Sequence, residues 1–513
     1  MSGASRTVNS ARNIGWGVIG KLTTLALSFI SRTVFIYCLG TVYLGVNGLF
    51  SNVLSILAFS ELGIGTAMNY SLYKPVADGN REKICSLMHA YKQAYRVVAG
   101  IIATLGLALL PWLDVFVKGA DGIGDIRVYY LLFLFNTVCS YFVTYKYGLV
   151  NAEQKNYILT NIDTCCRIAV TLVQIVVMLV FHDFLVYLLV QTGTQLLQQI
   201  FTALYLNRRY SYLERGTCQP LDHETKHSLI VNIRALICHQ IGSICVYQTD
   251  YILISMFISV GIVGLVSNYQ MMLSAVTGFI ILAMSSVVSS LGNLVATESL
   301  QKQMQIFRAY DFCGFWLYSF ETISFAVLCE PFITLWIGDD KLIDSLSWAL
   351  ILINIYFVGQ RDATFRFETA AGIFDPGKYA SIVQSIINLV VSVYGVNQWG
   401  LPGIYIGTIV SGIVITVWKP YVLYSYQFKK SCLPYFARLI RNAIFVGTII
   451  ALMLVLRGWI MPVVTIPAFV LMTFLTFIIP NLVIAVTFWR TNEMQYLNER
   501  VHILLQRKLA HGK

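Results

Sequence analysis

Two basic residues lie within the first apolar segment of the chain, residues 15–40. They are Lys21 and Arg32. A helix turns by about 100° per residue, so both return to nearly the same face, where Thr24 and Ser28 also lie. Charge inside a membrane is costly, and an ammonium and a guanidinium on one polar face are therefore a functional signal. The stripe predicts that this face lines a hydrated cavity.

A second polar stripe runs along residues 229–257. His239, Ser243 and Asp250 fall within about 80° of one another on a helix. Arg234 is on the opposite face, near the end expected to be cytoplasmic. Two striped helices predict a central water-filled cavity between two lobes.

Other charged residues within apolar segments do not form such polar stripes. Glu61 lies in the second segment, and Arg361 and Arg366 are in the inner half of the tenth. Each charge also has a structural interpretation. Arg32 is able to snorkel to the outer interface, Asp250 is able to form a hydrogen bond within one lobe, and the two arginines of the tenth segment are able to act as positive-inside anchors.

Residues 223–227 read HETKH, which matches the HExxH pattern of zinc proteases. The stretch lies in a polar linker and no third ligand follows at a familiar spacing, so it indicates a solvated helix start. We find no nucleophile triad, P-loop or dinucleotide fingerprint. No catalytic residue, metal, cofactor or enzymatic activity is therefore predicted.

The composition explains where these residues must lie. The chain has 513 residues, of which 57% are hydrophobic and only 12% charged, whereas a soluble domain needs about a quarter charged residues. Apolar runs of about 20 residues, enough for one helical crossing, recur along the whole chain. We predict an all-α polytopic membrane protein with about fourteen transmembrane helices.

Charge sets the orientation. Most of the 36 Lys and Arg fall in segments that share one side if the N- and C-termini are cytoplasmic. The net charge of +11 is therefore explained by topology and anionic membrane lipid, and no nucleic-acid partner is predicted.

The stretch GLFSN at 48–52 returns as GLVSN at 264–268, at equivalent places after a turn. This predicts two pseudo-symmetric six-helix lobes related by a parallel repeat, plus two C-terminal helices. The expected parts are an N-terminal lobe (1–207), a cytoplasmic linker (208–228), a C-terminal lobe (229–424), and helices 13 and 14 with a cytoplasmic tail (425–513).

Three runs carry a resemblance to a known family. SRTVFIYCLGTVYLGVNGLFSNVLSILAFSELGIGTAMNYSLYKP resembles the opening of bacterial polysaccharide flippases, a branch of the multidrug/oligosaccharidyl-lipid/polysaccharide exporter superfamily. YQTDYILISMFISVGIVGLVSNY, and FRFETAAGIF with NLVVSVYG, are similar to later parts of the same family. The resemblance implies transport of polyprenyl-pyrophosphate-linked oligosaccharide from the inner to the outer leaflet of the bacterial cytoplasmic membrane, for capsule, O-antigen or exopolysaccharide.

On that resemblance the cations acquire a role. Arginine binds phosphate in a bidentate way, so Lys21 and Arg32 are expected to bind the diphosphate, with Arg234, Arg361 and Arg366 as weaker candidates. Glu61 and Asp250 would pair with cations or bind a coupling ion. Thr24, Ser28, His239 and Ser243 would line the cavity, and turnover would be alternating access. Expected partners are the lipid-linked substrate, membrane lipid, a polysaccharide polymerase and other assembly proteins.

Two alternatives stay open. A drug or small-cation antiporter of the same superfamily would want a carboxylate-dominated cavity, whereas the charges here lean basic. A membrane polysaccharide polymerase or glycosyltransferase would need a sizeable outer loop with catalytic groups. The outer segments 114–126 and 332–345 contain several aspartates but are short.

Overall fold

The computed structural model describes residues 3–120, 122–215, 226, 229–230, 248–373 and 378–500. Every regular element in these residues is helical. Ten helices of this part are long and apolar enough to cross a membrane. The predicted class, an all-α polytopic membrane protein, is confirmed. The count of fourteen spans and the cytoplasmic termini stay predictions.

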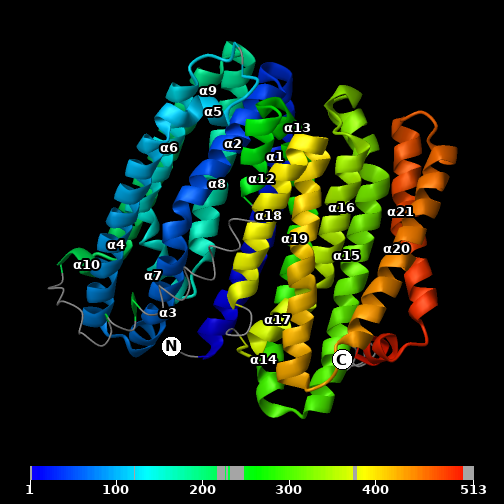
Figure 1. The fold of residues 1–513 in the computed structure, drawn as a ribbon. Coiled ribbons are helices and arrows are strands. Elements are labelled where there is room, and N and C mark those ends of the chain that lie inside the picture. The colour runs from blue at the N-terminus through cyan, green and yellow to red at the C-terminus, as the bar shows by residue number, and fades with distance from the viewer. Residues whose placement is uncertain are drawn as a thin grey trace, which may run out of the picture. The chain divides into compact units, whose positions relative to one another are not determined.

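The chain divides into two units, residues 1–267 and 268–513. The first contains α1 (Gly3–Leu39), α2 (Thr41–Leu57), η1 (Ala58–Glu61), α3 (Leu62–Asp78), α4 (Arg81–Ala108), η2 (Leu110–Trp112), α5 (Leu113–Phe116), α6 (Ile126–Thr144), α7 (Tyr147–Ala152), α8 (Tyr157–Phe181), α9 (Phe184–Arg209), α10 (Tyr212–Arg215) and α12 (Thr249–Phe257). Figure 1 shows these elements in blue to green.

The helix α13 (Val260–Ser285) begins in the first unit and continues in the second. The second unit then contains α14 (Val288–Thr297), α15 (Leu300–Ile337), η3 (Asp339–Lys341), α16 (Ser345–Gln360), α17 (Asp362–Ala370), α18 (Lys378–Trp399), α19 (Leu401–Val422), the π-helical η5 (Leu423–Phe428), α20 (Leu433–Ile460) and α21 (Ile466–Phe488). Both α20 and α21 pack against α15 (Figure 1).

Local sequence sets where these helices begin and end. A single residue, Gly40 at φ 87°, separates α1 from α2, a conformation that glycine adopts without strain. The Asp183 carboxylate accepts the Val186 N–H at the start of α9, and Asp344 accepts the Ser347 N–H at the start of α16. Such caps satisfy backbone donors that the helix itself cannot.

The order of continuous and interrupted helices occurs twice along the chain. In the first series, the second helix is interrupted between α2 and α3 and the fourth between α6 and α7. In the second series, which begins at α12, the second helix is interrupted between α13 and α14 and the fourth between α16 and α17. Packing follows the same order, because α3 contacts α4 and α7 as α14 contacts α15 and α17. Likewise, α9 contacts α6 and α8 as α19 contacts α16 and α18. The helix order and the contacts thus recur along the chain, as an internal repeat predicts; the two six-helix lobes and their bounds stay predictions.

Two glycines let α2 and the start of α13 touch backbone to backbone. A Cβ atom on Gly45 would lie 1.8 Å from the Val260 carbonyl oxygen, and one on Gly264 would lie 2.0 Å from the Thr41 carbonyl oxygen. The contact is reciprocal, since each glycine faces the carbonyl of the residue four positions before the other glycine, 264 − 4 = 260 and 45 − 4 = 41. It pairs Gly264 with Gly45 and not with Gly48, its counterpart in the sequence repeat. Gly48 faces the ring of Tyr251 instead.

Gly45→Ala is expected to destabilise the protein, because its methyl group would meet a backbone carbonyl that has no freedom to move aside. Overpacking of this kind lowers the free energy of unfolding by about 1–3 kcal/mol. The measurement is the thermal unfolding midpoint of the purified protein in detergent. Gly100→Ala on α4 is the matched control, because a Cβ there meets nothing within 4 Å. Equal midpoints for the two variants would contradict the close crossing of α2 and α13.

Candidate functional site

Arg32 of α1 reaches across to the start of α13. Its Nη1 donates to the Ser267 hydroxyl oxygen at 2.7 Å, and that hydroxyl in turn donates to the Gly264 carbonyl oxygen at 2.7 Å. Ser267 is buried, with 7% of its surface exposed. The guanidinium is therefore held by the GLVSN motif, at the point where α13 crosses α2.

Two tyrosines complete the surroundings of Arg32. Tyr187 of α9 and Tyr251 of α12 both interact electrostatically with the guanidinium. The Phe35 ring, one turn from Arg32, packs edge-on against Tyr187 with 5.2 Å between centroids. Elements α1, α9, α12 and α13 thus converge on one arginine, with polar and aromatic groups in place of aliphatic ones. Such a set of groups is suited to holding an anion beside a cation.

The rest of the predicted stripe lies along α1. Lys21, Thr24 and Ser28 are all half-buried. This helix packs against α8, and a Cβ on Gly20 would lie 2.9 Å from the Thr164 hydroxyl oxygen. The inner half of the stripe is therefore next to a helix that carries polar groups of its own.

Glu61 lies at the interruption between α2 and α3, among tyrosines. The Tyr95 hydroxyl donates to its Oε1 at 2.8 Å, and Tyr141 also hydrogen-bonds to it. The Tyr91 hydroxyl continues the chain to Tyr95 at 3.4 Å. Glu61 is thus hydrogen-bonded within the first unit, in a position that would suit a coupling ion or a structural carboxylate.

Asp250 is in the first turn of α12, where a carboxylate is favoured by the helix dipole. Its Oδ1 is inaccessible to solvent. Three predicted site residues, Arg234, His239 and Ser243, lie outside the described residues, as does the HETKH stretch apart from Lys226. Those predictions stay as they were.

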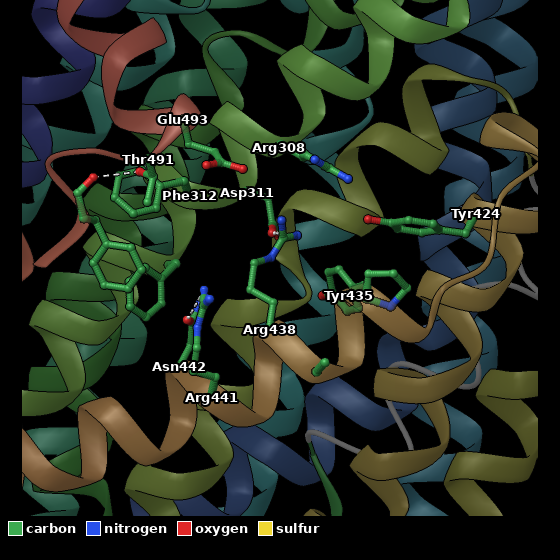
Figure 2. Close-up of a pocket in the computed structure, with 14 residues that line it drawn as sticks. Arg308, Asp311, Phe312, Tyr424, Tyr435, Arg438, Arg441, Asn442, Thr491 and Glu493 are labelled. Atoms are coloured by element: carbon green, nitrogen blue, oxygen red, sulfur yellow. Dashed lines mark hydrogen bonds and ion pairs between the residues drawn. The ribbon is translucent and has the colours of Figure 1, made fainter.

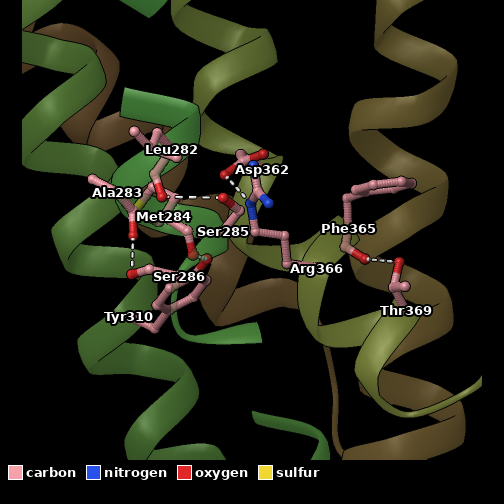
Figure 3. A network of polar contacts seen from close by, with 10 residues as sticks. All are labelled: Leu282, Ala283, Met284, Ser285, Ser286, Tyr310, Asp362, Phe365, Arg366 and Thr369. Carbon is pink, nitrogen blue, oxygen red and sulfur yellow. Dashed lines mark hydrogen bonds and ion pairs between the residues drawn. The ribbon is translucent and has the colours of Figure 1, made fainter. Parts of the chain in front are cut away.

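The charges of the tenth predicted segment are held by partners within the second unit. Arg361 lies at the interruption between α16 and α17, is 9% exposed, and donates to the Gly412 carbonyl oxygen of α19 at 3.1 Å. Arg366 pairs with Asp362 one turn earlier at 2.7 Å. Figure 3 shows this pair beside the interruption between α13 and α14. There, Ser285, Ser286 and Tyr310 donate to backbone carbonyls of residues 282–284.

The first unit has a counterpart to Arg361. Lys146 lies at the interruption between α6 and α7 and donates to Asn207 of α9. In both series of helices, therefore, the cation at the break in the fourth helix donates a hydrogen bond to the sixth helix, which is α9 in the first series and α19 in the second. This shared pattern points to a structural contribution of Arg361, beside its predicted role in binding.

Several functional candidates were not predicted from the sequence. Glu321, 1% exposed in the middle of α15, accepts the Thr277 hydroxyl at 2.5 Å. Lys419 of α19 pairs with the buried Glu368. Asp311 of α15 pairs with Arg438 of α20 at 2.6 Å. Glu321 stands alone in an apolar run, which is a signal that could have found it. The two ion pairs join residues far apart in the chain and carry no such signal.

Glu368→Gln is expected to lower the free energy of unfolding by about 3 kcal/mol, because it leaves the half-buried Lys419 ammonium without its carboxylate. Adding Lys419→Met should recover most of that loss. The measurement is a double-mutant cycle on the thermal unfolding midpoint.

Asp114→Asn provides the comparison, since the Arg127–Asp114 pair is exposed at 58% and 69% and should contribute less than about 1 kcal/mol. A Glu368→Gln variant as stable as Asp114→Asn would contradict a structural role for the pair.

Several solved transporter structures have a similar arrangement of helices. A lipid II flippase, MurJ, in an inward closed conformation matches with a TM-score of 0.61 and 15% identity, over 93% of this chain and 99% of that one. An inward-facing MATE-family multidrug resistance transporter of the MOP superfamily matches with a TM-score of 0.56 and 13% identity, over 79% and 98%.

The MATE multidrug transporter DinF-BH in complex with R6G matches with a TM-score of 0.57 and 14% identity, over 83% and 97%. No protein-family model and no curated protein matches the sequence. At these identities the likeness is one of fold: the chain has the fold of these transporters.

Proposed function

We propose that this protein is a membrane transporter that moves polyprenyl-pyrophosphate-linked oligosaccharide from the cytoplasmic to the outer leaflet of a bacterial cytoplasmic membrane. The observation that carries the proposal is Arg32, a guanidinium in a membrane helix, bonded to the motif at a helix crossing. The fold supports transport, and the flippase among the solved structures is matched over nearly its whole length.

The chemistry of the substrate explains why such a residue would be present. A diphosphate and a glycan cannot cross hydrocarbon unaided, whereas the polyprenyl tail can remain in the bilayer. A cation in a hydrated path would compensate the diphosphate charge, and the planar guanidinium binds phosphate through two parallel hydrogen bonds. Arg32 and Lys21 are the first candidates. Arg366 ranks below them because the Asp362 carboxylate already pairs with it, and Arg361 because its place at a helix break points to a structural contribution.

Replacing Arg32 by Ala is expected to reduce outward movement of the lipid-linked oligosaccharide at least about tenfold, the effect of losing one charge-assisted hydrogen bond. The measurement is the leaflet distribution of the lipid intermediate in a strain that lacks the chromosomal copy. Arg32→Lys should retain part of the activity, since lysine keeps the positive charge but cannot donate the two parallel hydrogen bonds of a guanidinium.

Arg167→Gln is the matched control, because it removes an exposed guanidinium from α8, another membrane helix. Its activity should equal that of the wild type at equal protein abundance. Normal export in the deletion strain, with no redundant flippase present, would refute the proposal. Export of single units that stay unpolymerised outside would point to a polymerase.

The fold supports a second candidate, because multidrug transporters share it. In that case the protein would exchange drugs or other cationic compounds for protons or sodium. Efflux of a cationic dye from cells separates the two. Dye efflux that depends on Glu61 and is indifferent to Arg32→Ala would favour the antiporter.

A further inference from the structure

A cavity of about 470 Å³ opens in the second unit. It lies where residues 308–315 of α15 and the first turns of α20 meet the end of α21 and the chain that follows it (Figure 2). Its lining combines three arginines with an apolar wall, and the internal repeat does not account for it, since α20 and α21 follow the two series of six helices.

The charges in this cavity are unequal. Arg438 is neutralised by Asp311, with 2.6 Å between Nη2 and Oδ2. Arg308 and Arg441 also line it, are exposed, and form no ion pair with any residue that the structure describes. The remaining acid, Glu493, interacts electrostatically with Asp311 and Arg438. Two guanidinium groups are therefore available to an anion.

Neutral groups in the cavity would serve the same ligand. Figure 2 shows the Arg308, Tyr424 and Arg438 side chains directed into one space. Tyr424 belongs to the π-helical η5, a rare element that is frequent at functional sites. The opposite wall is aromatic, with Phe488 packed on Phe312 and Phe315 at 5.4 Å between centroids. A ligand that fits both walls has an anionic head and an apolar body.

We propose that this cavity binds the phosphate of an anionic phospholipid at the cytoplasmic surface of the membrane. The positive-inside rule assigns this end of α15, α20 and α21 to the cytoplasm, since Lys302, Arg308, Lys429, Lys430 and Arg490 gather there. The helix dipole at the start of α20 adds to the attraction for an anion. The proposal does not depend on which substrate is transported.

The test uses the full-length protein in detergent, titrated with phosphatidylglycerol or with zwitterionic phosphatidylcholine. Binding is read by native mass spectrometry and by the shift of the thermal unfolding midpoint. The wild type should bind phosphatidylglycerol at least about tenfold more tightly than phosphatidylcholine. The Arg308→Gln/Arg441→Gln variant should lose that preference, whereas Arg308→Lys/Arg441→Lys should retain part of it.

Lys429→Gln/Lys430→Gln is the matched control, because it removes two exposed cations from the same end of the unit but outside the cavity. It should keep the wild-type preference for phosphatidylglycerol. If Lys429→Gln/Lys430→Gln also loses that preference, the preference comes from diffuse surface charge and the proposal is overturned. An unchanged preference in Arg308→Gln/Arg441→Gln would overturn it outright.

Inorganic phosphate distinguishes a lipid from a soluble ligand. If phosphate at millimolar concentration shifts the unfolding midpoint of the wild type but not of Arg308→Gln/Arg441→Gln, and displaces phosphatidylglycerol, the lipid assignment falls and a soluble phosphate compound replaces it. If phosphate has no effect while the lipid binds, the lipid assignment is supported. Neither result bears on leaflet transport by Arg32, so the two proposals fail separately.

Discussion

The low dielectric of the membrane interior governs this structure, because every charge and every broken turn of helix there must be satisfied by the protein itself. In the second unit Glu368 meets the requirement by pairing with Lys419 of the neighbouring helix α19. In the first unit it is met for Glu61 by tyrosine hydroxyls. Much of the charge within the spans thus holds helices together, and fewer charged side chains remain that could bind a ligand.

The interrupted helices follow from the same constraint. A break leaves backbone carbonyls without intrahelical donors, and side chains nearby supply them. Ser285, Ser286 and Tyr310 do so for the last turn of α13; Ser285 ends that helix, and Ser286 is a residue of the break. Cations at the breaks in the fourth helices, Lys146 and Arg361, bond to the sixth helix in each series. The breaks recur in the same order in both series, and so do the contacts of the short helices that follow them, since α3 packs on α4 and α7 as α14 packs on α15 and α17.

The sequence sufficed for the all-helical membrane class and for the existence of an internal repeat, since both depend on composition and on order along the chain. It also named Arg32 and the GLVSN motif as candidate features. It did not join them, because a contact over 235 positions between Arg32 and Ser267 depends on how helices cross. The sequence repeat aligns Gly264 with Gly48, whereas the helix crossing brings Gly264 against Gly45, three residues earlier. Packing of the two backbones sets this register, so the motif could not predict it. Asp311 and Arg438 could not be paired from spacing at all.

The way each cation is held separates structural candidates from binding candidates. Arg366 has a carboxylate one turn away on its own helix, and a guanidinium so neutralised has little charge left to offer a ligand. Arg32 donates to the Ser267 hydroxyl and interacts electrostatically with Tyr187 and Tyr251. Arg32 differs from Arg361 in its place: its serine partner belongs to the GLVSN motif where α13 crosses α2, whereas Arg361 lies at the break between α16 and α17. That position is the reason for ranking Arg32 above Arg361 and Arg366.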